Sequence, residues 1–223
     1  MNQIRVSAFQ WVPPQAQGLV RDLRVRWALE EAGVPYDVWL IGLGEEQKSE
    51  AYRRFQPFGQ VPAYEEDGLV LFESGAIVQH IAERHEVLMP TEPQARERTK
   101  CWIFAALNSV EPAFQVLMFV DVFNGDAEWT KHARPSALRW ATLRLDDLEA
   151  HLKSREYLED RFTAADLLMA SVLEIPRHTD LVAQRPALAA YLRRCLARPA
   201  YQKALADQLA VFARNAPPPA AGS

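Results

Sequence analysis

Cysteine is scarce in this sequence. Only two cysteines, Cys101 and Cys195, occur among 223 residues. They have neither Cys-x-x-Cys spacing nor histidines at zinc-ligand distance, which argues against a disulfide scaffold and a structural metal site. Cys101 stands beside Trp102 in a helix-period segment, and we interpret it as a buried thiol without a catalytic role. No metal is therefore expected.

Long apolar runs and an excess of positive charge are also missing. No uninterrupted apolar run approaches the roughly 18 residues that a membrane span needs, and the N-terminus lacks the basic-then-apolar layout of a signal peptide. The formal net charge is -4 at pH 7, which gives no electrostatic reason to expect nucleic acid as a partner. We expect a cytoplasmic protein that binds neither membranes nor nucleic acid.

The first part of the chain has the pattern of an α/β unit. Residues 4–9 alternate apolar and polar side chains, which predicts a strand. From about residue 19 the apolar positions fall at helical spacing, and Gly33 followed by Pro35 is typical of a helix end. Residues 36–41 are typical of a second strand. A strand, a helix and a strand favour a parallel pair with a crossover helix.

A hairpin and a further helix are predicted next. Asp67-Gly68 is the pair that a two-residue type I′ turn favours, so residues 62–66 and 69–72 are expected to be antiparallel neighbours. Ser74 stands where a helix N-cap belongs, and the helix that follows carries apolar residues at core spacing.

Beyond residue 84 the chain changes character. Residues 85–93 have no periodicity and form the expected linker after a domain at 1–84, and residues 94–214 indicate helices without a strand. Thr163 and Asp166 have the spacing of a capping box, which nucleates a helix and carries no chemistry. Residues 215–223 are rich in proline and small residues and are expected to be disordered.

Three motifs resemble those of the soluble glutathione transferases. They are Pro57-Phe-Gly-Gln-Val-Pro62, Phe72-Glu-Ser-Gly-Ala-Ile77 and Phe162-Thr-Ala-Ala-Asp-Leu167, and three motifs in order are more specific than one. The resemblance covers essentially the whole chain and is to bacterial-like members. It implies a thioredoxin-like α/β domain with a four-stranded mixed sheet, an all-helical bundle domain, a cis bond before Pro62, a glutathione site and a homodimer.

The expected glutathione site fits the chemistry of that tripeptide. Ser74 and the helix N-terminus suit the γ-glutamyl carboxylate, and Glu73 suits the ammonium. A cis bond before Pro62 would turn the Val61 amide and carbonyl towards the cysteinyl backbone. Lys48 and Gln60 are candidates for the glycyl carboxylate. From the residues alone, Ser74 is also readable as a simple cap and Lys48 as a solvated surface lysine.

The loop after the first strand departs from the family pattern. Relatives commonly carry a Tyr, Ser or Cys there, facing the glutathione sulfur, but no Ser, Thr, Cys or Tyr lies between Ser7 and Tyr36. Without a loop cysteine, thiol-disulfide exchange through a protein-bound intermediate is disfavoured. The remaining donors are the backbone amides of residues 15–18 and the side-chain amides of Gln15 and Gln17, and Gln15 is the catalytic candidate.

The expected function is a glutathione transferase-like enzyme that directs the glutathione thiolate at a hydrophobic electrophile, the chemistry of detoxification. Two alternatives stay open: a glutathione-dependent peroxidase or disulfide reductase, and a non-catalytic binding or interaction protein that kept the fold. A second-substrate pocket for a small apolar molecule is expected from four residues, namely Trp11, Asn108, Pro112 and Phe119.

Overall fold

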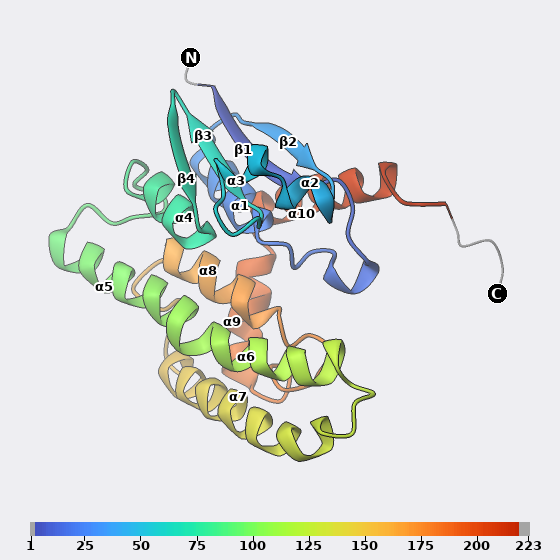
Figure 1. The fold of residues 1–223 in the computed structure, drawn as a ribbon. Coiled ribbons are helices and arrows are strands. Elements are labelled where there is room, and N and C mark those ends of the chain that lie inside the picture. The colour runs from blue at the N-terminus through green and yellow to red at the C-terminus, as the bar shows by residue number, and fades with distance from the viewer. Residues whose placement is uncertain (1–2, 219–223) are drawn as a thin grey trace. The chain divides into compact units, whose positions relative to one another are not determined.

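The sheet predicted for the N-terminal part is present in the computed structural model, which describes residues 3–218 (Figure 1). Strand β1 (Ile4–Phe9) pairs in parallel with β2 (Asp37–Ile41) and antiparallel with β3 (Ala63–Glu66), which pairs antiparallel with β4 (Leu69–Phe72). The strand order is β2-β1-β3-β4. The predicted four-stranded mixed sheet is confirmed.

Helix α1 (Asp22–Ala32) crosses over between the two parallel strands. It begins about three residues later than its periodicity indicated. Leu23, Val25 and Trp27 are buried along it, and burial of such side chains stabilises the fold by about 1.5–3 kcal/mol each. The helix ends where predicted, because Gly33 adopts the left-handed conformation with φ 66°, which costs glycine little.

The predicted hairpin joins β3 to β4. Asp67 and Gly68 have φ of 48° and 86°, as a type I′ turn requires at both central positions, and Glu66 is paired with Leu69. Helix α4 (Ser74–Ala82) follows. Short helices occupy the loops of this unit: the 3₁₀ helix η1 (Pro14–Ala16), α2 (Glu45–Lys48) and α3 (Glu50–Arg53).

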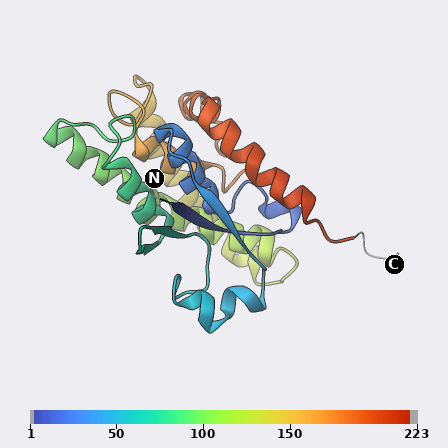
Figure 2. The ribbon, with the colours of Figure 1, turned by 90° about the horizontal axis from the view of Figure 1, so that it is seen from above.

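The final helix, α10 (Pro199–Arg214), belongs to the same compact unit as the sheet. It packs on α1, where the ring centroids of Trp27 and Tyr201 are 4.7 Å apart and Gln208 Nε2 donates to Asp22 Oδ1 at 2.8 Å (Figure 2). The predicted helical domain at 94–214 therefore needs a correction at its end, because the apolar face of α10 is buried against α1.

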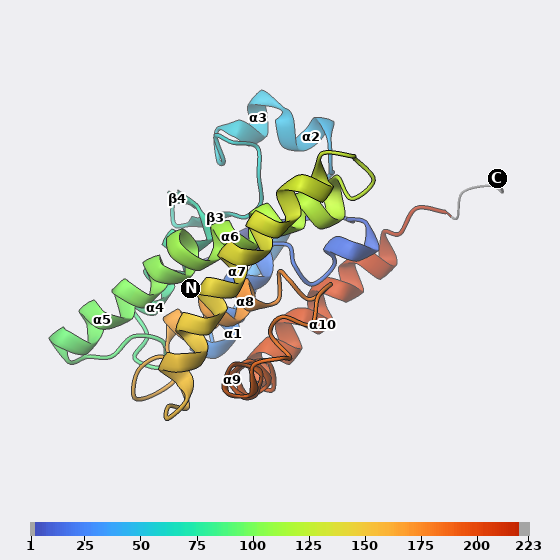
Figure 3. The same ribbon diagram turned by 90° about the horizontal axis from the view of Figure 1, so that it is seen from below.

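The second compact unit, Ala82–Arg198, consists of helices joined by turns and loops and contains no strand among its described residues. Its helix α6 packs on α7 (Figure 3). The predicted all-helical region is confirmed, and a loop that includes Asn124 and Gly125 precedes α7. The elements are α5 (Pro93–Phe104), the π-helical η2 (Ala105–Val110), α6 (Glu111–Met118), the π-helical η3 (Phe119–Phe123), α7 (Thr130–Leu152), α8 (Ala164–Leu173) and α9 (Pro186–Leu196).

The continuous helical stretch Pro93–Phe123 is long and apolar enough, by length and composition alone, to cross a membrane. Within its most apolar window 44% is buried in the structure. Core helices of soluble proteins pass the same test, so the stretch does not identify a membrane protein.

The exposure of Cys101 differs from expectation. Cys101 is exposed on α5 and Cys195 is buried on α9, so the interpretation of Cys101 as a buried thiol is wrong, because it lies on the solvent side of its helix. Of the predicted disordered tail, residues 215–218 contain no helix or strand, and residues 219–223 lie outside the described residues.

Candidate functional site

The start of α4 differs from the prediction by one residue. The Glu73 carbonyl accepts the first helical bond, from Ile77 N–H at 3.0 Å, and the helix begins at Ser74. Glu73 therefore occupies the capping position that the sequence assigned to Ser74. Glu73 has φ 69°, a region that non-glycine residues adopt at a cost of about 1–3 kcal/mol. Such conformations are concentrated at functional sites.

A buried cation lies beside Ser74. The Arg24 guanidinium on α1 donates from Nη1 to Ser74 Oγ at 3.4 Å, and both residues are 4% exposed. Sequence reasoning missed Arg24. The only signal was its place one turn before Ala28, on the predicted apolar face of the helix. A hydroxyl, a guanidinium and the N-terminus of α4 together suit a carboxylate.

The loop before β3 is held in one conformation by its own contacts. The Val61-Pro62 peptide bond is cis, as expected. Gln47 Nε2 donates to Gly59 O at 3.0 Å. Gly59 has φ 64°, and a Cβ there would lie 2.7 Å from Gln47 O, so only glycine fits this approach. Neither the amide nor the carbonyl of Val61 is hydrogen-bonded within residues 3–218.

A buried network of hydroxyl groups holds the same loop in place. Tyr52 Oη donates to Gln60 O at 2.6 Å and lies 2.7 Å from Ser7 Oγ, which accepts from Ala63 N–H at 2.6 Å. Burial raises the pKa of Tyr52, so the phenol stays a neutral donor. The network links β1 and α3 to residues 60–63, and a change in it should displace Val61.

Several groups that were predicted to donate hydrogen bonds to the glutathione sulfur are hydrogen-bonded within the loop after β1. Ala16 N–H donates to Pro13 O at 2.9 Å, and Gln17 N–H donates to Pro14 O at 3.2 Å. The Gln17 side chain donates to Val12 O at 3.2 Å. Gln15 is exposed on η1. These bonds reduce the donors that the loop can offer to a ligand, and Gln15 stays the predicted catalytic residue.

The other predicted site residues are placed as follows. Lys48 and Gln60 are both exposed in the first unit, where Trp11 is half-buried. In the second unit Asn108 and Phe119 are exposed and Pro112 is half-buried. No group of three or more His, Cys, Asp or Glu side chains that could hold a metal occurs within residues 3–218.

Comparison with known proteins gives matches along most of the chain. Residues 16–83 match the glutathione S-transferase N-terminal domain and residues 113–199 the glutathione S-transferase C-terminal domain. The chain is 32% identical to glutathione S-transferase 3 of Zea mays over 82% of this chain and 88% of the relative. It is 30% identical to a glutathione S-transferase of Hyoscyamus muticus over 82% of this chain and 92% of the relative.

Solved structures show the same architecture. A glutathione transferase from Burkholderia graminis, crystallised with two glutathione molecules per subunit, is 25% identical and superposes with a TM-score of 0.79. The match covers 91% of this chain and 87% of that one.

Proposed function

Because this chain belongs to the glutathione S-transferase family and is a glutathione transferase-like enzyme, we propose that it binds glutathione on the first unit and directs the thiolate at a hydrophobic electrophile. The observation that carries the proposal is the buried Arg24–Ser74 contact at the start of α4. The Ser74 hydroxyl, the Arg24 guanidinium and the N-terminus of α4 lie together there, and in combination they suit the γ-glutamyl carboxylate. Glutathione in the solved Burkholderia graminis relative supports this choice.

Each remaining polar group of glutathione is assigned to a donor or acceptor of the first unit. The ammonium is assigned to the exposed Glu73 carboxylate. The cysteinyl backbone is assigned to the amide and carbonyl of Val61, held next to Pro62. The glycyl carboxylate is assigned to Lys48 or Gln60. In this arrangement the backbone of glutathione pairs with the loop before β3 as an added strand would.

The chemical step is assigned to the loop after β1. Gln15 is the proposed donor to the glutathione sulfur, because its side-chain amide is exposed on η1 in the loop after β1. Thiolate stabilisation by such donors is an electrostatic effect that needs no protein nucleophile. That Trp11, Asn108, Pro112 and Phe119 line one second-substrate pocket stays a prediction.

A homodimer is also proposed. Strand β4 lies at the edge of the sheet, and its Leu69, Val70 and Phe72 are exposed, as is Phe58 at 66%. Phe58 packs against Phe72 with ring centroids 6.2 Å apart. Exposed apolar edge strands invite pairing with another chain. Phe58→Ser should shift the protein towards monomer in sedimentation equilibrium, and an unchanged mass would remove this surface from the interface. We also propose that the protein is cytoplasmic and acts in detoxification.

The central test is glutathione binding by the purified chain. Retention on immobilised glutathione and a rise in Tm with free glutathione are expected, since a ligand that binds the folded state stabilises it by mass action. The absence of both would overturn the proposal and leave the interaction-protein alternative. Binding followed by turnover of an aryl halide supports transfer, whereas turnover of only a hydroperoxide or a mixed disulfide would favour the peroxidase or reductase alternative.

A further inference from the structure

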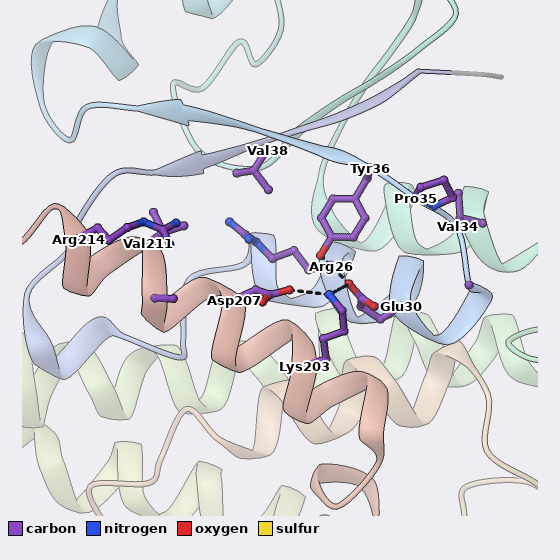
Figure 4. Close-up of a pocket in the computed structure, with 12 residues that line it drawn as sticks. Arg26, Glu30, Val34, Pro35, Tyr36, Val38, Lys203, Asp207, Val211 and Arg214 are labelled. Carbon is purple, nitrogen blue, oxygen red and sulfur yellow. Dashed lines mark hydrogen bonds and ion pairs between the residues drawn. The ribbon is translucent and has the colours of Figure 1, made fainter.

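A second pocket, of about 600 Å³, lies in the first unit between the end of α1, the start of β2 and α10 (Figure 4). This volume is in the range of small-molecule sites. Arg26 lines it from α1, Tyr36 and Val38 from the β2 side, and Val211 and Arg214 from α10. No residue assigned above to glutathione lines it.

Arg26 has an unusual hydrogen-bond deficit in this pocket. It is 2% exposed, and its Nε donates to Asp22 Oδ2 at 2.7 Å. Its Nη2 is buried and has no hydrogen-bond partner among the described residues. Asp22 cannot readily serve it, because its Oδ1 accepts from Gln208 at 2.8 Å. Leaving a buried charged donor unpaired is costly, so an acceptor from outside the chain would stabilise this arrangement.

The acidic side chains of the pocket are already engaged. Lys203 Nζ lies 2.8 Å from Glu30 Oε1 and 2.7 Å from Asp207 Oδ2, and Tyr36 Oη donates to Glu30 at 3.2 Å (Figure 4). The side chain of Arg214, in contrast, is exposed and forms no hydrogen bond or ion pair within residues 3–218. Two guanidinium groups therefore lack a full set of acceptors, whereas the carboxylates of Glu30 and Asp207 each accept from a donor within the chain.

We propose that this pocket binds a small organic carboxylate, with its anion between Arg26 and Arg214 and an apolar body against Val38 and Val211. Guanidinium groups bind carboxylates through paired N–H donors. The aliphatic wall distinguishes an organic anion from an inorganic one, which would gain nothing from Val38 and Val211. The site is independent of the glutathione assignment.

Benzoate, benzamide and inorganic phosphate are suitable probes, titrated calorimetrically into the full chain saturated with glutathione and, separately, without it. Benzoate should bind with one site per chain in both titrations. Benzamide, which has the same body without the charge, should bind at least about tenfold more weakly, the effect of losing one charge-assisted hydrogen bond. Absence of benzoate binding, or equal affinity for benzamide, would overturn the proposal. Phosphate binding as tightly as benzoate would overturn the organic part of it.

Variants locate the site. Arg26→Gln should abolish binding, but it also leaves Asp22 unpaired and therefore risks unfolding the chain. Two exposed positions on α10 avoid this problem: Arg214→Gln should weaken benzoate several-fold, and Ala210→Phe should block the pocket that Ala210 lines. Ala206→Phe, on the same helix but outside the pocket lining, is the matched control and should bind normally. Unchanged benzoate affinity in both Arg214→Gln and Ala210→Phe would place the carboxylate elsewhere.

Discussion

The starts of α8 and α4 are two helix N-termini that the sequence marks with a hydroxyl residue, and they use it in opposite ways. At α8, Thr163 and Asp166 are fully buried, and each satisfies the other within a capping box. At α4, Ser74 is the first helical residue, Glu73 is exposed with a positive φ, and the polar neighbour is a guanidinium from α1. Internal satisfaction of the polar groups indicates a structural role. A buried guanidinium that donates to a hydroxyl at a helix N-terminus, beside a residue with positive φ, suits a bound anion.

If the start of α8 is structural, the largest loss of stability is expected from a change at Asp166. Its carboxylate accepts from Leu158 N–H and Thr163 N–H, each at 2.9 Å, and from Tyr191 Oη at 3.1 Å. Asp166→Ala leaves these buried donors unpaired and should lower the free energy of unfolding by about 3–5 kcal/mol in urea titrations. The exposed Asp160→Ala is the control, with a change within about 0.5 kcal/mol. A loss at Asp166 no larger than the control would contradict the structural role of this N-terminus.

The pH dependence of stability tests the same carboxylate. Burial raises the pKa of Asp166 from 3.8 to about 6. The folded chain then holds the carboxyl proton more tightly than the unfolded chain between these two values. Stability from this group is thus present below the unfolded pKa and is lost as pH rises towards 6, by a total of about 3 kcal/mol.

Asp166→Asn isolates that contribution, because the amide does not titrate. The stability of the wild type relative to this variant should fall as pH rises from about 4 to 6, and then stay level. Urea titrations at several pH values measure it. A difference that does not change with pH would show that the folded chain leaves the pKa of Asp166 near its ordinary value.

Ser74→Ala, in contrast, should weaken glutathione binding and change stability little. Loss of a hydrogen bond to a charged group costs about 1.5–3 kcal/mol, so glutathione affinity should fall by about tenfold or more. Stability should change by less than about 1 kcal/mol, because the capping position is held by the Glu73 backbone and not by the Ser74 hydroxyl. Calorimetric titration with glutathione measures the affinity. An unchanged affinity would remove Ser74 from the site.

Much of the fold was predictable because it depends on local rules. The turn at Asp67-Gly68, the helix end at Gly33 and the capping box at Thr163 each follow from the conformational preferences of the residues involved, and each is confirmed. The grouping of α10 with the sheet was not predictable in this way. It depends on a contact between Trp27 and Tyr201, which are far apart in sequence. The residue pattern of α1 does not indicate that α10 will pack on it, and the pattern of α10 does not indicate α1.

The candidate site shows the same division. The cis bond before Pro62 and the position of Ser74 near a helix start followed from short motifs. Arg24 did not, because its role arises only when the fold brings its guanidinium, from α1, to the Ser74 hydroxyl at the start of α4. The engagement of Ala16 and Gln17 within their own loop was also beyond the sequence, since it depends on the 3₁₀ turn that the two prolines start.

Thr163→Ala gives the smallest effect and completes the comparison with Ser74→Ala. Thr163 Oγ1 accepts from Ala165 N–H at 3.3 Å, and the Asp166 side chain still accepts from the Thr163 backbone amide in the variant. The hydroxyl also donates to Asp166 Oδ2 at 3.2 Å, and this bond is lost as well. Because the backbone half of the capping box remains, the free energy of unfolding should fall by about 1 kcal/mol. Glutathione affinity, measured on the same preparation, should be unchanged. If Thr163→Ala weakened glutathione binding as much as Ser74→Ala, the two N-termini would not differ in function and the division between a structural and a ligand-binding helix start would fail.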